Sequence, residues 1–267
     1  MTDREKVIEV RGLRNQFGSQ VVHENLDLDV YKGEILGVVG GSGSGKSVLL
    51  RSIIGLNHPA AGSVRVFGQD VTKLSDRERI AIEQRCGVLF QNGALFSSLT
   101  VTENVMVPMR EHHDLTQALM ARLAALKIAF AGLPAEAGLK YPSELSGGMV
   151  KRAALARSLA LDPDILFLDE PTAGLDPIGA AAFDQLILTL RESLGLTVFL
   201  ITHDLDTLYT ICDRVAVIAQ KRVLIADTLD KVERFDDPWV QDYFQGPRGR
   251  AAEHAATARA SVPPSGP

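Results

Sequence analysis

Short apolar runs recur along most of the chain, and helical patterns separate several of them. The runs cover residues 35–39, 86–90, 165–168, 197–202 and 214–219. Continuous apolar runs of this length are typical of strands buried on both faces of a parallel sheet, which helical crossovers connect. The pattern therefore predicts an α/β fold with a mostly parallel core sheet and right-handed crossovers.

The N-terminal part of the chain follows a different pattern. Residues 6–10 and 21–30 have the composition of strands, and in the second segment Leu28 alternates with Asp27 and Asp29. Such alternation places one face of a strand on a core and the other in water, as in antiparallel sheets. We therefore expect an N-terminal antiparallel β subdomain.

The middle of the chain lacks strand-type runs until Ile165. Helical periodicity instead covers residues 102–107, 115–130 and 147–161. Apolar positions spaced in this way predict amphipathic helices. We expect a helical subdomain at about residues 92–160, inserted into a domain of residues 1–245. The remainder, residues 246–267, is rich in Ala, Arg, Pro, Gly and Ser and is predicted to be a disordered tail.

A loop rich in glycine and serine directly follows the apolar run at residues 35–39. It consists of Gly40, Gly41, Ser42, Gly43, Ser44, Gly45, Lys46 and Ser47, which match G-x-x-x-x-G-K-[ST] at every fixed position. Small residues let successive N–H groups turn toward an anion at the start of a helix. Lys46 supplies a full charge for the β- and γ-phosphates, and the Ser47 hydroxyl is a ligand for Mg²⁺. This loop predicts a nucleoside triphosphate site.

Polar residues follow three of the predicted strands, namely Gln91, the pair Asp169 and Glu170, and His203. Because ligands bind at the carboxyl ends of parallel strands, we expect these side chains to meet at the phosphates. Asp169 would hold Mg²⁺ directly or through water, and Glu170 would polarise an attacking water. His203 would orient the γ-phosphate or Glu170, and Gln91 would contact Mg²⁺ or the water. Each residue alone is a weak indication, whereas the ordered set predicts hydrolysis.

A second glycine-rich helix start lies at residues 145–149, Leu-Ser-Gly-Gly-Met. One interpretation is that Ser146 simply caps the helix that follows. The other is that a ligand approaches closely, because Gly147 and Gly148 each cost the first turn about 1 kcal/mol of helix stability.

Composition and charge narrow the function further. The 267 residues are 46% hydrophobic, carry a formal charge of −5, and contain no apolar run near the ~20 residues of a membrane helix. The charged N-terminal residues lack the apolar region of a secretory signal, so we expect the chain in the cytosol. The negative charge disfavours a nucleic-acid-binding role. Cys86 and Cys212 are expected to be small buried hydrophobes in a reducing compartment.

With these motifs in order, the chain resembles the nucleotide-binding subunit of an ABC transporter over about residues 6–235. The matching motifs are the Walker A loop at 40–47, the Q-loop at Gln91, the signature at 145–149, Walker B at 165–170, the D-loop at 173–176 and the switch His203. The resemblance implies that two copies sandwich two ATP molecules head to tail with Mg²⁺. Ser146, Gly147, Gly148 and Asp176 would then act in trans, and Phe17 would stack on adenine.

Several stretches are more similar to the MlaF-like ATPases of Mce-linked lipid transport systems. They cover residues 89–96, 105–112, 143–149 and 174–178. This resemblance implies a transmembrane permease, a STAS-type subunit and an Mce-domain protein as partners. It also implies phospholipid transport across the Gram-negative envelope, with the chain peripheral on the cytoplasmic face of the inner membrane. Met149 replaces the glutamine usual in ABC signatures, in agreement with this subgroup.

Some alternatives remain open at this point. An ABC importer for a polar solute or a non-transport ABC ATPase would share most of these motifs, whereas a GTPase would leave the second glycine motif unexplained. Apolar residues between Gln91 and Glu111 would either face the permease or fill the helical core. The aromatic residues after Pro238 would either clasp a partner protomer or cover their own domain. The pair His112-His113 favours a solvated face over a metal site.

Overall fold

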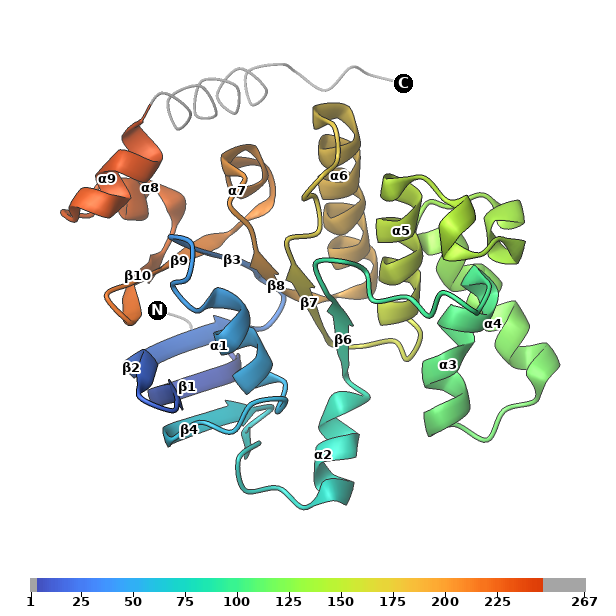
Figure 1. Ribbon diagram of the computed structural model, residues 1–267, viewed down its shortest axis with the longest axis horizontal. Coiled ribbons are helices and arrows are strands. Elements are labelled where there is room, and N and C mark those ends of the chain that lie inside the picture. Colours follow the sequence, from blue (N-terminus) through green and yellow to red (C-terminus); the bar gives the residue numbers. More distant parts are fainter. Residues whose placement is uncertain (1–3, 247–267) are drawn as a thin grey trace.

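The computed structural model describes residues 4–246 and contains two sheets. The smaller sheet has the strand order β2-β1-β4-β5 and is antiparallel (Figure 1). Its strands are β1 (Lys6–Phe17), β2 (Gln20–Tyr31), β4 (Ala61–Val66) and β5 (Gln69–Asp70). Both predicted N-terminal strands are confirmed, although β1 runs seven residues past the predicted end at Val10.

The larger sheet has the strand order β10-β9-β3-β8-β7-β6. Its strands are β3 (Ile35–Gly40), β6 (Cys86–Leu89), β7 (Ile165–Asp169), β8 (Thr197–Ile201), β9 (Arg214–Ala219) and β10 (Arg222–Asp227). Pairs from β6 to β9 are parallel, and only β10 pairs antiparallel to its neighbour. The predicted α/β fold with a mostly parallel core sheet is thus confirmed.

Strand β10 was not predicted, because its turn lacks the usual sequence signal. Gln220 and Lys221 both adopt positive φ, at 49° and 65°. Two-residue hairpins need this backbone and usually use Asn-Gly or Asp-Gly to reach it. Here two longer side chains take the same conformation, so the turn is invisible to a search for glycine.

Helices cover both faces and one end of the larger sheet (Figure 1). They are α1 (Lys46–Ile53), α2 (Asp76–Glu83), α3 (Val101–His112), α4 (Gln117–Phe130), α5 (Gly147–Ser158), α6 (Pro177–Leu194), α7 (Leu205–Ile211), α8 (Leu229–Glu233) and α9 (Pro238–Gln245). Two short 3₁₀ helices, Ala135–Leu139 and Pro142–Glu144, precede α5. Helices α3, α4 and α5 pack together within the stretch where the sequence predicts a helical subdomain.

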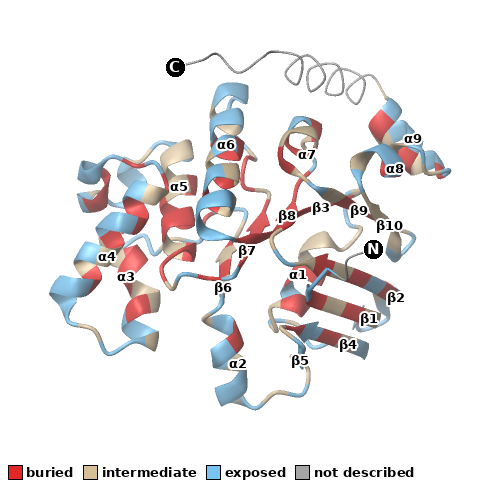
Figure 2. Cartoon of the chain, turned by 180° about the vertical axis from the view of Figure 1, so that it is seen from behind, coloured by how far each residue is buried: buried red, intermediate tan, exposed pale blue. Residues whose placement is uncertain are grey.

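The hydrophobic core lies on both faces of the larger sheet, whose central strands are buried in Figure 2. In β7, Leu166 and Leu168 belong to the cluster that includes α5 and α6, whereas Ile165 and Phe167 join the cluster that includes α1 and the small sheet. The alternation follows from the two-residue period of a strand. Burial on both faces explains why the sequence shows unbroken apolar runs.

Two open interpretations are settled by burial. Val101 and Val105 are fully buried and belong to the helical core, which is one of the two alternatives, whereas Phe96 is 52% exposed. In α9, Val240 and Phe244 pack against the end of the larger sheet, so these residues cover their own domain.

The remaining expectations concern metal, cysteine and membrane features. The part of the chain that the structure describes contains no group of three His, Cys, Asp or Glu side chains able to hold a metal ion. Cys86 and Cys212 are free, and burial raises the pKa of both thiols. Within residues 4–246 no helix is both long and apolar enough to cross a bilayer. The predicted tail lies almost entirely outside the described residues.

Candidate active site

The glycine-rich loop connects the end of β3 at Gly40 to the start of α1 at Lys46. Gly45 has φ of 96°, and a Cβ there would lie 2.4 Å from His23 Nε2. At Gly40 a Cβ would lie 2.3 Å from the Ile218 carbonyl oxygen. Close packing therefore requires glycine at both positions, and the positive φ requires it at Gly45 as well.

The lysine of this loop folds back over the loop backbone. Lys46 Nζ donates to the carbonyl oxygens of Gly40, at 2.8 Å, and Gly41, at 3.2 Å. Burial lowers the pKa of the Lys46 ammonium, while Glu170 and Asp169 act in the opposite direction. Beside it, a pocket of about 320 Å³ is lined in part by Gln20, Val22 and Ser47. The loop thus presents a cation and backbone N–H groups beside a pocket, as phosphate binding requires.

Ser47 and Asp169 fit the predicted magnesium site. Ser47 Oγ lies 3.2 Å from Asp169 Oδ1, although 122 residues separate them in sequence. Asp169 ends strand β7 and is 7% exposed, and burial raises the pKa of its carboxyl despite the Ser47 hydrogen bond. A hydroxyl and a carboxylate at the edge of a phosphate site form the oxygen donor set that Mg²⁺ prefers. These residues therefore fit the cation that the sequence predicts.

Glu170 and His203 form a close pair at the ends of neighbouring strands. His203 Nδ1 lies 2.6 Å from Glu170 Oε2, and the side chains are 70% and 14% exposed. Glu170 follows β7 directly and has φ of 51°, a left-handed conformation that is uncommon outside glycine. Strained backbone of this kind concentrates at functional sites. The carboxylate is therefore held beside the phosphate loop at some conformational cost.

Gln91 lies two residues beyond the end of β6, and its side chain is exposed. Its carbonyl oxygen accepts a hydrogen bond from Lys151 Nζ, which also donates to the Glu170 carbonyl oxygen at 3.2 Å. Burial lowers the pKa of the Lys151 ammonium. The structure therefore links the backbones of Gln91 and Glu170, whereas it gives the Gln91 amide no contact with Ser47 or Asp169.

Ser146 caps helix α5, its hydroxyl accepting from Met149 N at 3.4 Å. Within residues 4–246, a Cβ added at Gly147 would meet no atom within 4 Å, and one at Gly148 would meet only Leu175 Cδ2 at 3.7 Å. Neither glycine has positive φ. Nothing among the described residues therefore requires two glycines here. Figure 1 also shows α5 well separated from α1, with strands of the larger sheet between them.

Two more predicted site residues have clear structural settings. Phe17 ends β1 and is 52% exposed, so its ring is not packed into the small sheet. Asp176 caps α6, its Oδ1 accepting from Ile178 N at 3.1 Å and Gly179 N at 2.9 Å. The structure brings neither residue to Glu170 or Asp169 within this chain.

Sequence reasoning missed His23, which lies under the phosphate loop. His23 is fully buried, its Nδ1 is 3.0 Å from Asn15 Nδ2, and Ser52 Oγ donates to Asn15 Oδ1 at 3.1 Å. Because the Asn15 oxygen accepts from Ser52, the Asn15 amide nitrogen donates to His23 Nδ1, which is therefore the acceptor. The proton of the neutral imidazole is then on Nε2, which faces Gly45. Burial lowers the pKa of His23 to about 4. The one signal for His23 in the sequence was that it follows Val21 and Val22 in a predicted strand, which suggested that its side chain points inward.

Comparisons with known proteins agree with this geometry. The family model described as ABC transporter matches residues 23–173. The intermembrane phospholipid transport system ATP-binding protein MlaF of Haemophilus influenzae is 40% identical over 242 residues, which cover 91% of each chain. The methionine import ATP-binding protein MetN of Mannheimia succiniciproducens is 39% identical over 242 residues, which cover 90% of this chain and 66% of that protein.

A solved structure extends the comparison to three dimensions. It is the dimeric post-hydrolysis state of an ATP-binding cassette bound to ADP and Pi, with a TM-score of 0.77 and 29% identity. The match covers 83% of this chain and 98% of that chain. Taken with the phosphate loop and the Glu170–His203 pair, these similarities show that the chain belongs to the ABC transporter family, as an ATP-binding subunit that hydrolyses ATP.

Proposed function

We propose that this ATPase drives phospholipid transport across the Gram-negative envelope. The observation that carries the proposal is the 40% identity to MlaF over 91% of both chains, because such coverage leaves no large part of either protein unmatched. The MlaF-type residues after the Q-loop and in the signature, including Met149, agree with this assignment. The chain would bind peripherally at the cytoplasmic face of the inner membrane through its permease.

Within the proposal, each residue of the pocket has one task. Gly40 to Ser47 would bind the phosphates of ATP, and Ser47 and Asp169 would hold Mg²⁺, with Gln91 as a further contact. The cation would neutralise charge that develops on the phosphates. Glu170 would orient the attacking water, and His203 would hold Glu170 and contact the γ-phosphate. Phe17 would stack on the adenine ring.

A second copy of the chain would complete each ATP site. The exposed Ser146 and Gly147 and the half-buried Gly148 would face the Walker A loop of the partner, with Asp176 beside the shared interface. The absence of any packing reason for two glycines supports this arrangement, because an approaching phosphate or backbone would supply the reason. Ile178, which is 84% exposed next to Asp176, is an apolar side chain that a protomer interface would cover.

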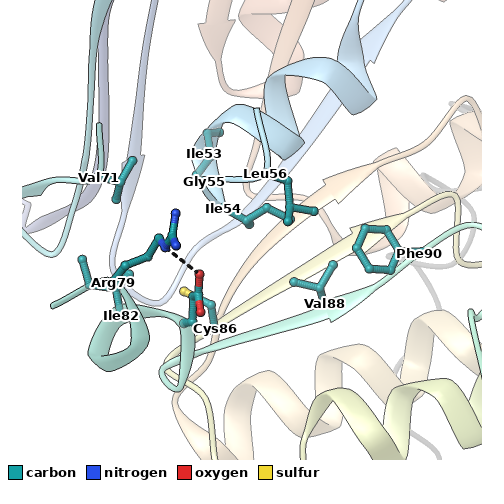
Figure 3. A pocket seen from close by; sticks show the side chains of 11 residues that line it. Ile53, Ile54, Gly55, Leu56, Val71, Arg79, Ile82, Cys86, Val88 and Phe90 are labelled. Carbon is teal, nitrogen blue, oxygen red and sulfur yellow. Dashed lines mark ion pairs between the residues drawn. The ribbon is translucent and has the colours of Figure 1, made fainter. Parts of the chain in front are cut away.

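The permease would contact the molecule beside the Q-loop. An apolar pocket of about 290 Å³ lies between the end of α1, the helix α2 and the strand β6, and its lining side chains are drawn in Figure 3. Leu56, Val88 and Phe90 line it, and the ion pair between Arg79 and Glu83 lies at its polar side. Such a groove fits a short amphipathic helix. Phe90 directly precedes Gln91, so a helix bound in the groove would shift the position of Gln91 at the ATP site.

Two further partners follow from the lipid assignment. They are a small STAS-type subunit and an Mce-domain lipid-binding protein.

A second candidate function is import of a polar solute, which the 39% identity to the methionine importer subunit favours.

One purification separates these possibilities. The chain, tagged and expressed from its own locus, is isolated from detergent-solubilised membranes, and its partners are identified by mass spectrometry. A multispanning protein with an Mce-domain protein, in a complex that transfers fluorescent phospholipid between vesicles on ATP addition, would support lipid transport. A periplasmic solute-binding protein would support the importer instead. Exclusively ribosomal or chromosomal partners would refute both forms of the proposal.

A further inference from the structure

The last described helix reaches the switch histidine. Tyr243 of α9 donates its hydroxyl hydrogen to the carbonyl oxygen of His203 at 3.1 Å, across 40 residues of sequence. Burial raises the pKa of the Tyr243 phenol, so the hydroxyl keeps its proton and remains a donor. The aromatic residues after Pro238 therefore do more than cover apolar surface.

A second contact of the same helix reaches the phosphate loop. The Trp239 and Tyr243 rings stack with centroids 4.9 Å apart and an interplanar angle of 13°. Trp239 Nε1 lies 3.6 Å from the position that a Cβ on Gly41 would occupy. The stacked pair thus connects Gly41 of the phosphate loop with His203.

The helix is held in place by contacts that do not involve the Tyr243 hydroxyl. Val240 and Phe244 are buried in a cluster with Val39 and Val217 of the larger sheet. Asp237 caps the helix, accepting from Trp239 N at 2.9 Å and from Gln220 Nε2 at 3.3 Å. The hydroxyl therefore projects from a supported platform, and its removal leaves that platform intact.

His203 needs such support, because it lies in the short connection between β8 and α7. Its side chain is 70% exposed, and it contacts Glu170 Oε2 at 2.6 Å. A hydrogen bond to the backbone carbonyl limits rotation of this peptide and hence the directions open to the imidazole.

We propose that Tyr243 is a positioning residue for ATP hydrolysis, which holds the backbone of His203 so that the imidazole stays directed at Glu170 and the γ-phosphate. The inference rests on the proposed roles of His203 and Glu170. The C-terminal helix thereby belongs to the catalytic apparatus, and any displacement of α9 would be transmitted to turnover.

The test is Tyr243→Phe in the full-length chain, which removes one oxygen and keeps the ring stack. Loss of one neutral hydrogen bond predicts a fall in kcat of about fivefold. The KM for ATP and the thermal midpoint are expected to stay unchanged, and the effect should vanish in a His203→Ala background. Tyr209→Phe is the matched control, because its hydroxyl bonds Glu233 away from the site.

The outcomes are distinct. Wild-type kcat in Tyr243→Phe, with His203→Ala inactive, would overturn the positioning role and leave the proposed function standing. A loss of kcat that accompanies a lower thermal midpoint would also overturn it, because the hydroxyl would then serve the fold. Full turnover in His203→Ala and Glu170→Gln would instead refute the catalytic roles on which the inference rests.

Discussion

The imidazole Nδ1 of His203 lies 2.6 Å from Glu170 Oε2, and this contact joins the ends of two neighbouring parallel strands. In the register of β7 and β8, Asp169 is opposite Ile201, so Glu170 and His203 leave the sheet side by side. The fold of one chain therefore brings a base candidate and its orienting partner into contact. This relationship leads to the first prediction.

Glu170→Gln is expected to abolish turnover while ATP still binds. The amide keeps the size of the side chain and removes the charge that would polarise the attacking water, so kcat should fall at least about 100-fold. Dimers that bind ATP and cannot hydrolyse it should accumulate. Steady-state phosphate release and gel filtration with ATP measure the two effects. Normal hydrolysis by the variant would rule out Glu170 as the base.

Two inactive variants should restore activity when mixed, because each ATP site of the proposed dimer would draw on both copies. Lys46→Ala removes the ammonium group that would bind the phosphates of ATP. Gly147→Asp places a carboxylate at an open position of the signature. A mixed dimer retains one site with both parts intact, so a random mixture should recover up to about a quarter of wild-type ATPase activity. Each variant alone serves as the control. No recovery above these controls would argue for sites built within one copy.

Asp169→Asn is expected to weaken the binding of Mg²⁺ at the ATP site. The substitution removes a charged oxygen 3.2 Å from Ser47 Oγ, so the Mg²⁺ concentration for half-maximal activity should rise by about tenfold or more. Titration of ATPase activity with MgCl₂ measures this change. Asp164→Asn, which alters a surface ion pair with Arg85 at the other end of β7, is the control. Equal Mg²⁺ requirements in both variants would exclude Asp169 from the cation site.

His23 should make the folded chain less stable in mild acid. Its pKa is about 4 in the fold against an ordinary value of 6.5, so the unfolded chain binds a proton at a pH where the folded chain does not. Stability is therefore lost as pH falls below 6.5, by about 2 kcal/mol at pH 5. His23→Gln should lack this component. Urea unfolding of both proteins at pH 7.5, 6 and 5 provides the comparison, and parallel pH profiles would contradict the assignment.

Much of the fold was predictable because the relevant signals are local. Unbroken apolar runs marked the strands of the larger sheet, since these strands are buried on both faces. The loop from Gly40 to Ser47 was predictable because its steric and charge requirements lie in eight consecutive residues. Strand β10 escaped prediction, since Gln220 and Lys221 form its turn without glycine. The positions of Val101 and Val105 stayed open in the sequence, because an apolar side chain has the same pattern whether it faces a core or a partner.

The sequence by itself determined the α/β class, the phosphate loop and the order of the motif residues, because burial period and glycine spacing are properties of contiguous segments. Only the tertiary structure decided which contacts the loop and the motif residues make with the rest of the fold. It placed His23 beneath Gly45, Lys151 between Gln91 and Glu170, and Tyr243 on His203. The physical reason is that these contacts depend on the strand order β10-β9-β3-β8-β7-β6 and on how helices close over it, which local periodicity does not specify.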